Sequence, residues 1–270
     1  MGTPRLVASD VDGTLLDPME TVTPRTAAVV ARVVAAGTPF VLVSGRPPRW
    51  IPKVAAAAGV TGLAVCANGS VLYDIADDRI VATHLLSPDV LGDLVHAVRS
   101  ALPDCRVATE RVGGSALAMA GQEFATEAGY RHPWPGDNIY TAPLAEVLGH
   151  PAVKLLVRHG GMTSDELSAA VVAVLGDVVE ITYSSSVGMV ELAPRGVTKG
   201  TGLAEVAQRL DVPAADVLAF GDMPNDVPML RWAGHGVAMA NGHPEVLAVA
   251  DEVTAANGED GVAQVLERWF

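Results

Sequence analysis

Short apolar runs alternate with amphipathic stretches over the first third of the chain. Three of the runs are typical of buried strands, and they occupy residues 6–9, 39–46 and 63–70. Between the first two, Thr23 is a predicted N-cap, Pro24 takes the first helical position and Gly37 ends the helix. A second helix is expected at 49–59, with Pro52 in its first turn. Strands separated by helices predict a parallel sheet with right-handed crossovers.

The pattern changes after the third strand. A hairpin is expected next, and helices and strands are then mixed up to about residue 188. One helix in this region is opened by a capping box of Thr163 and Glu166. The alternation of strand and helix returns near Val190 and continues to the end of the chain. We therefore predict the α/β class, with a Rossmann-like, doubly wound parallel-sheet core at residues 1–85 and 189–270 and an inserted α+β domain at 86–188.

Composition supports a large core and argues against two kinds of partner. The 270 residues are 50% hydrophobic, with a mean hydropathy of +0.32, which is enough for two packed domains. A net charge of −13 and a pI of about 4.8 argue against nucleic acid or an anionic membrane surface as the main partner. No uncharged apolar run reaches the roughly 18 residues that a spanning helix needs.

Two further features indicate a cytoplasmic protein. Cys66 and Cys105 lie in apolar surroundings outside any CxxC pair, which favours buried thiols in a reducing compartment. The first residues lack the apolar segment of a signal peptide, because acidic residues arrive by Asp10. The sequence gives no indication of the oligomeric state.

Polar residues follow the predicted strands at their carboxyl ends, where open parallel sheets bind ligands. These stretches are Asp10-Val-Asp12-Gly-Thr, Ser44-Gly45-Arg46, Asn68-Gly69 and Gly221-Asp222-Met-Pro-Asn225-Asp226. Two carboxylates as close as Asp10 and Asp12 repel each other unless a cation joins them. Asp10, Asp12 and Asp222 could supply oxygen ligands, and oxygen ligands with few carboxylates suit Mg²⁺.

A lysine near the start of a helix points to an anion. Lys199 comes one residue after the predicted N-cap Thr198, where its charge opposes the positive end of the helix dipole. We therefore expect an anion to hold Lys199 in this position. Ser44, Lys199 and backbone N–H groups of the glycine-rich turns could together bind a phosphoryl group.

Four elements in this order resemble the haloacid dehalogenase superfamily of phosphohydrolases. They are "DVDGT" (10–14), Ser44, Lys199 and "GDMPND" (221–226). The insertion after "NGS" and the ending "GVAMANGHPEVLAVADEVTAANGEDGVA" resemble its Cof-type branch, HAD-IIB. In that branch a large α+β cap, of the C2B type, lies between the serine and lysine motifs.

The resemblance implies a Mg²⁺-dependent phosphatase that acts on small phosphorylated metabolites, such as sugar phosphates, through an aspartyl-phosphate intermediate. Asp10 would be the nucleophile, and Asp12 would be the general acid and then the general base. Mg²⁺ would be held by the Asp10 carboxylate, the Asp12 backbone carbonyl and the Asp222 carboxylate. The phosphoryl oxygens would be bound by Ser44, Gly45, Lys199 and Asn225. Asp226 would orient the site or bind the metal through water.

Some residues have a simpler interpretation as well. Arg46 could form a surface ion pair, Asn68 could serve only the turn, and Asp226 could complement a helix start. Lys154 could face the active site, although an edge-strand lysine that extends its amine to water is the favoured interpretation. For the whole chain, the alternatives are a phosphotransferase or phosphomutase on the same scaffold, or a non-catalytic protein that binds a phosphorylated ligand.

Overall fold

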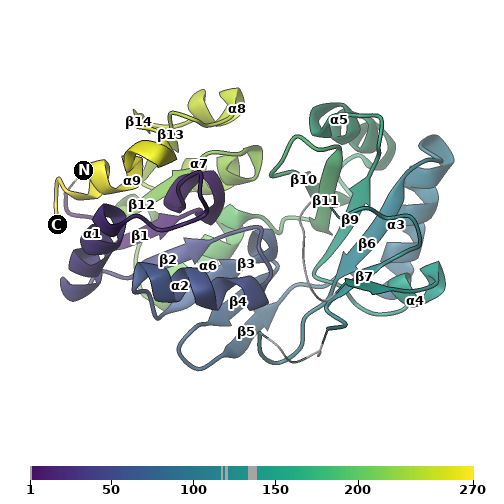
Figure 1. The fold of residues 1–270 in the computed structure, drawn as a ribbon, viewed down its shortest axis with the longest axis horizontal. Coiled ribbons are helices and arrows are strands. Elements are labelled where there is room, and N and C mark those ends of the chain that lie inside the picture. Colours follow the sequence, from purple (N-terminus) through teal and green to yellow (C-terminus); the bar gives the residue numbers. More distant parts are fainter. Residues whose placement is uncertain (1, 117, 119–120, 133–138) are drawn as a thin grey trace. The chain divides into compact units, whose positions relative to one another are not determined.

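The computed structural model describes residues 2–116, 118, 121–132 and 139–270. The chain forms two compact units, each of which is described by itself (Figure 1). The first unit consists of Met1–Ala82 and Thr198–Phe270, and the second of Thr83–Val197. Among the described residues, no helix has both the length and the apolar character needed to cross a membrane.

The first unit is built on an eight-stranded sheet with the order β14-β13-β12-β1-β2-β3-β4-β5. Its strands are β1 (Leu6–Ser9), β2 (Phe40–Val43), β3 (Leu63–Cys66), β4 (Val71–Asp74), β5 (Arg79–Thr83), β12 (Val217–Gly221), β13 (His235–Met239) and β14 (Glu252–Thr254). The strands from β14 to β3 run parallel, and β4 is antiparallel to β3. The chain adds strands on one side of β1 and later on the other, so the order reverses between β1 and β12. Ligands bind at such a reversal in open α/β sheets.

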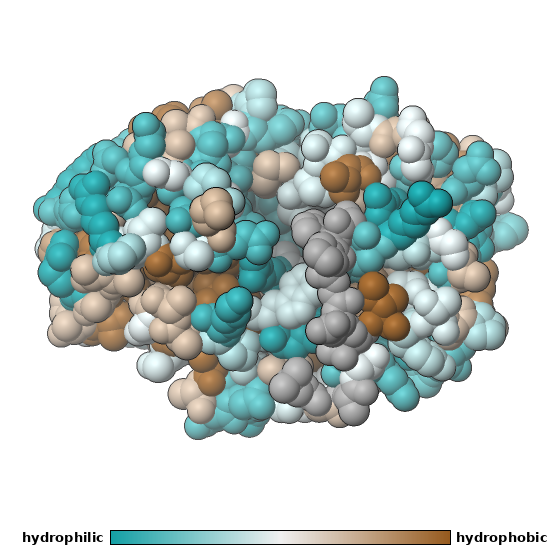
Figure 2. Space-filling model, viewed as in Figure 1, coloured by the Kyte–Doolittle hydropathy of each residue, from teal (hydrophilic) through white to brown (hydrophobic). Residues whose placement is uncertain are grey.

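Helices cover both faces of this sheet, which confirms the predicted doubly wound α/β class. They are α1 (Pro24–Ala35), α2 (Ile51–Ala58), α6 (Lys199–Arg209), α7 (Val227–Trp232), α8 (Pro244–Leu247) and α9 (Gly261–Leu266). Figure 1 shows α1 and α2 in front of the strands and α6, drawn fainter, behind them. Leu6 and Ala8 of β1 pack in one cluster with Leu203 of α6 and Met229 of α7. Figure 2 shows apolar residues in small separate groups among polar ones on the visible face of this unit.

Local signals placed the helix starts of the first unit correctly. The Thr23 hydroxyl accepts a hydrogen bond from the Thr26 backbone N–H at 3.1 Å, so the predicted cap of α1 is confirmed. Pro52 lies in the first turn of α2, where its missing N–H has no helical partner to lose.

The thiol of Cys66 is free and buried, as is that of Cys105 in the second unit.

Over its described residues, the second unit combines a six-stranded sheet with helices α3, α4 and α5, which fits the expected α+β composition. The sheet order is β10-β11-β9-β6-β7-β8. Its strands are β6 (Arg106–Glu110), β7 (Phe124–Thr126), β8 (Ile139–Thr141), β9 (Lys154–Arg158), β10 (Val179–Thr182) and β11 (Met189–Pro194). Its helices are α3 (Pro88–Ala101), α4 (Leu144–Leu148) and α5 (Ser164–Leu175). The capping box predicted at the start of α5 is present, because Thr163 and Glu166 exchange side-chain to backbone hydrogen bonds.

The limits of the units differ from the expected domain limits. The apolar run from Met189 resembles a core strand, but β11 pairs antiparallel with β9 and with β10 in the second sheet. The chain therefore returns to the first unit only at Thr198, beyond the expected position 189. The boundary between the two units depends on which distant strands pair with each other. The local pattern of apolar residues does not contain this information.

Candidate active site

Four neighbouring strand ends bring the expected site residues to one edge of the first sheet. Asp10 follows β1, and its backbone N–H donates to the Phe220 carbonyl of β12 at 2.9 Å. Ser44 follows β2, and its N–H donates to the Val65 carbonyl of β3 at 2.8 Å. Because adjacent parallel strands end at the same edge, the segments after β1, β2, β3 and β12 meet there.

Three buried carboxylates form the centre of this edge. Asp10, Asp222 and Asp226 are 4%, 5% and 0% exposed, and one carboxylate oxygen from each lies within 4.8 Å of the others. Lys199, at the start of α6, places Nζ 2.6 Å from Oδ1 of Asp10 and 2.6 Å from Oδ1 of Asp226. The sequence predicts an anion next to Lys199. In the structure, the carboxylates of Asp10 and Asp226 lie next to its ammonium group.

Burial perturbs the ionisation of this cluster. It raises the pKa of Asp10 well above its ordinary value, and the charge of Lys199 offsets only part of this effect. Burial and the neighbouring charge of Asp226 raise the pKa of Asp222 to about 7, against a hydrogen bond from Thr14. Burial lowers the pKa of Lys199, but the charges of Asp10 and Asp226 prevail and raise it.

The donor set fits a divalent metal ion. When all three carboxylates are ionised, one ammonium leaves an excess of negative charge that a divalent cation can offset, and oxygen donors of this kind are the preferred ligands of Mg²⁺. Gly13 provides space for this cluster, because a Cβ atom there would lie 2.2 Å from Oδ2 of Asp222. Gly13 also has φ +77°, a conformation that favours glycine.

Asp226 connects two segments of the site. While Oδ1 accepts from Lys199, Oδ2 accepts hydrogen bonds at 3.0 Å from the backbone N–H groups of Asp222 and Met223. Its side chain therefore shapes its own loop and reaches α6. Its bond from Met223 belongs to a helix start, as in the alternative role, but the contacts with Lys199 and the Asp222 backbone go beyond that role.

Asp12 takes a direction different from that of Asp10. Its side chain is 53% exposed, and Arg46 donates to both of its oxygens, at 2.8 Å from Nε and 2.5 Å from the terminal nitrogen. Asp12 does not belong to the carboxylate cluster of Asp10, Asp222 and Asp226, and its side chain pairs with Arg46 instead. Of the three expected metal ligands, the structure brings together the carboxylates of Asp10 and Asp222. Asp226 takes the third place in the cluster.

The remaining expected residues line the same edge. Ser44 is 1% exposed, and its hydroxyl accepts from the Arg46 backbone N–H at 3.0 Å, with Gly45 between them in the chain. Asn225 donates from Nδ2 to Oδ1 of Asn68 at 3.0 Å, and both side chains are buried. Arg46 is therefore an ion-pairing residue, but its partner Asp12 is itself an expected site residue.

Two residues of this edge were missed by sequence reasoning. The Thr14 hydroxyl donates to Oδ1 of Asp222 at 2.9 Å, and its place inside "DVDGT" was the available signal. Asn241, after β13, donates from Nδ2 to the Gly13 carbonyl at 2.8 Å. The Asn-Gly pair at this strand end, which resembles the one after β3, could have identified it.

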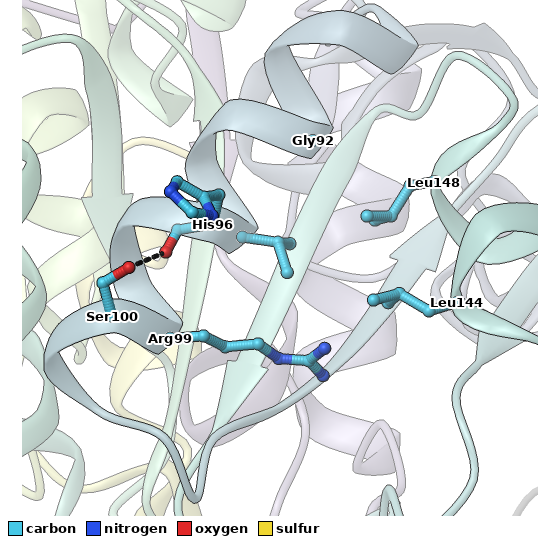
Figure 3. A pocket seen from close by; sticks show the side chains of 7 residues that line it. Gly92, His96, Arg99, Ser100, Leu144 and Leu148 are labelled. Carbon is cyan, nitrogen blue, oxygen red and sulfur yellow. Dashed lines mark hydrogen bonds between the residues drawn. The ribbon is translucent and has the colours of Figure 1, made fainter.

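A pocket of about 360 Å³ in the second unit contains none of the expected site residues (Figure 3). It lies between α3 and α4 and is lined by Gly92, Val95, His96, Arg99, Ser100, Leu144 and Leu148. The Ser100 hydroxyl is directed along its own helix, to the His96 carbonyl at 2.8 Å. Arg99 is engaged with Glu127.

Comparisons with known proteins agree with this geometry. The family model for haloacid dehalogenase-like hydrolases matches residues 7–266. The 5-amino-6-(5-phospho-D-ribitylamino)uracil phosphatase YitU of Bacillus subtilis is 29% identical over 99% of this chain and 98% of its own length. A haloacid dehalogenase-like hydrolase from Bacteroides thetaiotaomicron has a similar structure, with a TM-score of 0.76, 25% identity and coverage of 98% of this chain and 99% of its own.

A second solved structure has a similar fold. The HAD subclass IIB sugar phosphatase BT4131 has a TM-score of 0.80 at 19% identity, with 98% of both chains covered. The likeness at this identity concerns the fold, and it includes the large insertion between the Ser44 and Lys199 segments. The family match spans both ends of the core and the insertion. The chain therefore belongs to the haloacid dehalogenase-like hydrolases, as an enzyme of their phosphatase class.

Proposed function

We propose that the chain is a Mg²⁺-dependent phosphatase that hydrolyses small phosphorylated metabolites through an aspartyl-phosphate on Asp10. The observation that carries the proposal is the buried cluster of Asp10, Asp222 and Asp226 with Lys199 between two of its members. A phosphoryl group needs mainly positioning and charge stabilisation, and one cation with a metal-binding carboxylate cluster can supply both.

The metal would be held by the carboxylates of Asp10 and Asp222 and by the backbone carbonyl of Asp12. Asp226 would orient this set or contribute through a water molecule. When bound, Mg²⁺ supplies positive charge that offsets the carboxylates and the phosphoryl oxygens. The phosphoryl oxygens would also be bound by Lys199, Ser44, the backbone at Gly45, and Asn225.

In the first step, a carboxylate oxygen of Asp10 attacks phosphorus, and the bond from phosphorus to the leaving oxygen breaks. Asp12 donates a proton to that oxygen, so an alcohol leaves and Asp10 carries the phosphoryl group. In the second step, Asp12 takes a proton from water. The resulting oxygen attacks the same phosphorus, inorganic phosphate leaves, and Asp10 is regenerated.

The different surroundings of Asp10 and Asp12 suit these two roles. Asp10 is buried and held by Lys199, which fixes a nucleophile in one place. Asp12 is half exposed, where a proton can be exchanged with water, and Arg46 donates to both of its oxygens; this pairing favours the ionised carboxylate, so it must open before Asp12 acts as an acid. Arg46 would therefore orient Asp12 before the substrate binds.

Substrate choice would be set by the inserted α+β unit, acting as a cap domain. YitU is named for a phosphorylated ribitylaminouracil and BT4131 for sugar phosphates. We therefore propose a small, polyhydroxylated phosphate monoester as the substrate class. The free, buried thiols of Cys66 and Cys105 fit a cytoplasmic location for such an enzyme.

Phosphate release from a panel of phosphorylated metabolites, in Mg²⁺ and in EDTA, tests the proposal. We expect release from a subset of the panel in Mg²⁺ only. Asp10→Asn should lower release by at least about 10³-fold, because removal of a nucleophile costs this much or more. Unchanged release in EDTA, or full activity of Asp10→Asn, would contradict the proposal. Transfer of phosphate to a second sugar with little free phosphate would identify a phosphotransferase.

A further inference from the structure

The turn between β3 and β4 has an unusual backbone. Ala67, Asn68 and Gly69 have φ of +48°, +57° and +102°, so three consecutive residues have positive φ. For residues with a Cβ atom this conformation costs about 1–2 kcal/mol each, and it persists where its surroundings require it. The contacts of the turn show what requires it.

One side of the turn packs against the start of α6. A Cβ atom on Gly69 would lie 2.1 Å from the Thr198 carbonyl oxygen. A Cβ atom on Gly202 of α6 would lie 2.9 Å from the Gly69 Cα. The turn and the first turn of α6 are therefore in direct backbone contact, next to Lys199.

The other side of the turn is bonded to the segment after β2. The backbone N–H of Asn68 donates to the Ser44 carbonyl at 3.1 Å, and that of Ala67 donates to the Arg46 carbonyl at 2.9 Å. These two bonds hold both ends of the Ser44–Arg46 segment. A single turn thus joins the segments that carry Ser44 and Lys199.

The Asn68 side chain reaches a third segment of the site. Its Oδ1 accepts a hydrogen bond from Nδ2 of Asn225 at 3.0 Å, and both residues are 4% exposed. An amide nitrogen has two hydrogens, so this bond fixes the plane of the Asn225 amide and leaves the second hydrogen for another acceptor. Oδ1 of Asn225 is buried and has no hydrogen-bond partner among the described residues. This oxygen is an acceptor, so it is a candidate for contact with a donor such as a bound water, while the second hydrogen of Nδ2 is the group that can bond to a phosphoryl oxygen.

We propose that Asn68 is a positioning residue for phosphoryl binding. Its side chain orients the Asn225 amide, and its backbone joins the Ser44 and Lys199 segments. This inference rests on the proposed function, in which Ser44, Lys199 and Asn225 contact the phosphoryl oxygens. Loss of the side chain should therefore weaken phosphate binding while the fold remains, because glycine adopts the left-handed backbone without strain.

The test compares Asn68→Gly with a matched control. Asp211→Gly replaces another left-handed residue, with φ +55°, which is exposed in the turn after α6. The readouts are kcat and KM for p-nitrophenyl phosphate in Mg²⁺, inhibition by inorganic phosphate, and the urea unfolding midpoint. We expect Asn68→Gly to lower kcat/KM and weaken phosphate inhibition by about 10–100-fold, the usual cost of removing a group that orients a ligand-binding residue. Asp211→Gly should leave kcat/KM and phosphate inhibition unchanged.

A double-mutant cycle separates positioning from a general structural role. If Asn68 acts through Asn225, then Asn68→Gly should change kcat/KM by no more than about 2-fold in the Asn225→Ala background. A loss of about 10-fold or more in that background would overturn the proposal. Wild-type kinetics of Asn68→Gly in the otherwise unchanged chain would overturn it as well.

A measurement on the wild-type chain covers the case in which Asn68→Gly does not fold. Inorganic phosphate with Mg²⁺ should shift the side-chain amide resonance of Asn225, which Asn225→Ala identifies by its loss. A chain that hydrolyses p-nitrophenyl phosphate without this shift would overturn the role of Asn68 and leave the proposed function standing. A wild-type chain that neither hydrolyses the probe nor binds phosphate would overturn both.

Discussion

The ammonium group of Lys199 lies 2.6 Å from the carboxylate of Asp10, and both side chains are buried. The contact joins the start of α6 to the end of β1, two segments 189 residues apart in the chain. Lys199 makes an equally short contact with Asp226. One cation therefore holds two carboxylates of a cluster of three, and without a metal burial raises the pKa of Asp10 and of Asp222.

Removal of this cation should destabilise the fold. Lys199→Met leaves the buried carboxylates of Asp10 and Asp226 without their counter-charge, so we expect the free energy of unfolding to fall by about 3–5 kcal/mol. Urea unfolding in EDTA at neutral pH measures the change. Lys53→Met, on the exposed side of α2, is the matched control and should change stability little. Equal stabilities of the two variants would show that Lys199 has no structural role.

Much of the site could be predicted because it depends on local pattern. Asp10 and Asp222 follow buried strands directly, and parallel strand ends coincide, so their proximity followed from the chain order. The direction of Asp12 did not, because it depends on the backbone turn at Gly13 and on a partner, Arg46, from another strand end. Spacing of residues in a motif does not contain this information.

Prediction from local sequence pattern is less successful still in the second unit. The sequence favours Lys154 as an edge-strand residue that extends its amine to water, and this prediction is wrong. The lysine lies on β9, between β11 and β6, and is 5% exposed. Strand order in an antiparallel sheet is set by pairing between distant segments. The same kind of pairing places β11 in the sheet of the second unit.

The Gly13 site should not accept a side chain. In Gly13→Ala the new Cβ would clash with Asp222, so we expect Mg²⁺-dependent phosphate release to fall by about 10-fold or more. Gly37→Ala is a close control, because Gly37 has the same φ of +77° and no described atom within 4 Å of the added Cβ. Both variants bear the backbone strain of about 1–2 kcal/mol. Similar losses of activity in the two would attribute the effect to strain and contradict the prediction.

The buried pair of Lys154 and Glu191 should stabilise the second unit only as a pair. Nζ of Lys154 lies 2.6 Å from Oε1 of Glu191, and Glu191 is 3% exposed. Lys154→Met leaves that carboxylate buried without this partner, so the free energy of unfolding should fall by about 3–5 kcal/mol. Lys154→Met combined with Glu191→Leu should recover much of the loss. Arg195→Met, which breaks the exposed pair with Asp177, should change stability little in the same urea titration.

Metal binding should strengthen as pH rises, because Asp222 must lose its proton to act as a ligand. Burial, with the charge of Asp226, raises the pKa of Asp222 from its ordinary value of 3.8 to about 7 in the metal-free fold. Between these values the folded state binds more protons than the unfolded state, so Asp222 makes the metal-free protein less stable as pH rises.

Mg²⁺ reverses this trend, since it binds the deprotonated carboxylate. The increase in Tm on adding Mg²⁺ should therefore be small at about pH 5.5 and large at about pH 8. In Asp222→Asn the increase should be reduced and should depend less on pH than in the wild-type chain, with the part of the dependence that Asp10 contributes remaining. An increase of the same size at both pH values in the wild-type chain would exclude Asp222 as a titrating ligand.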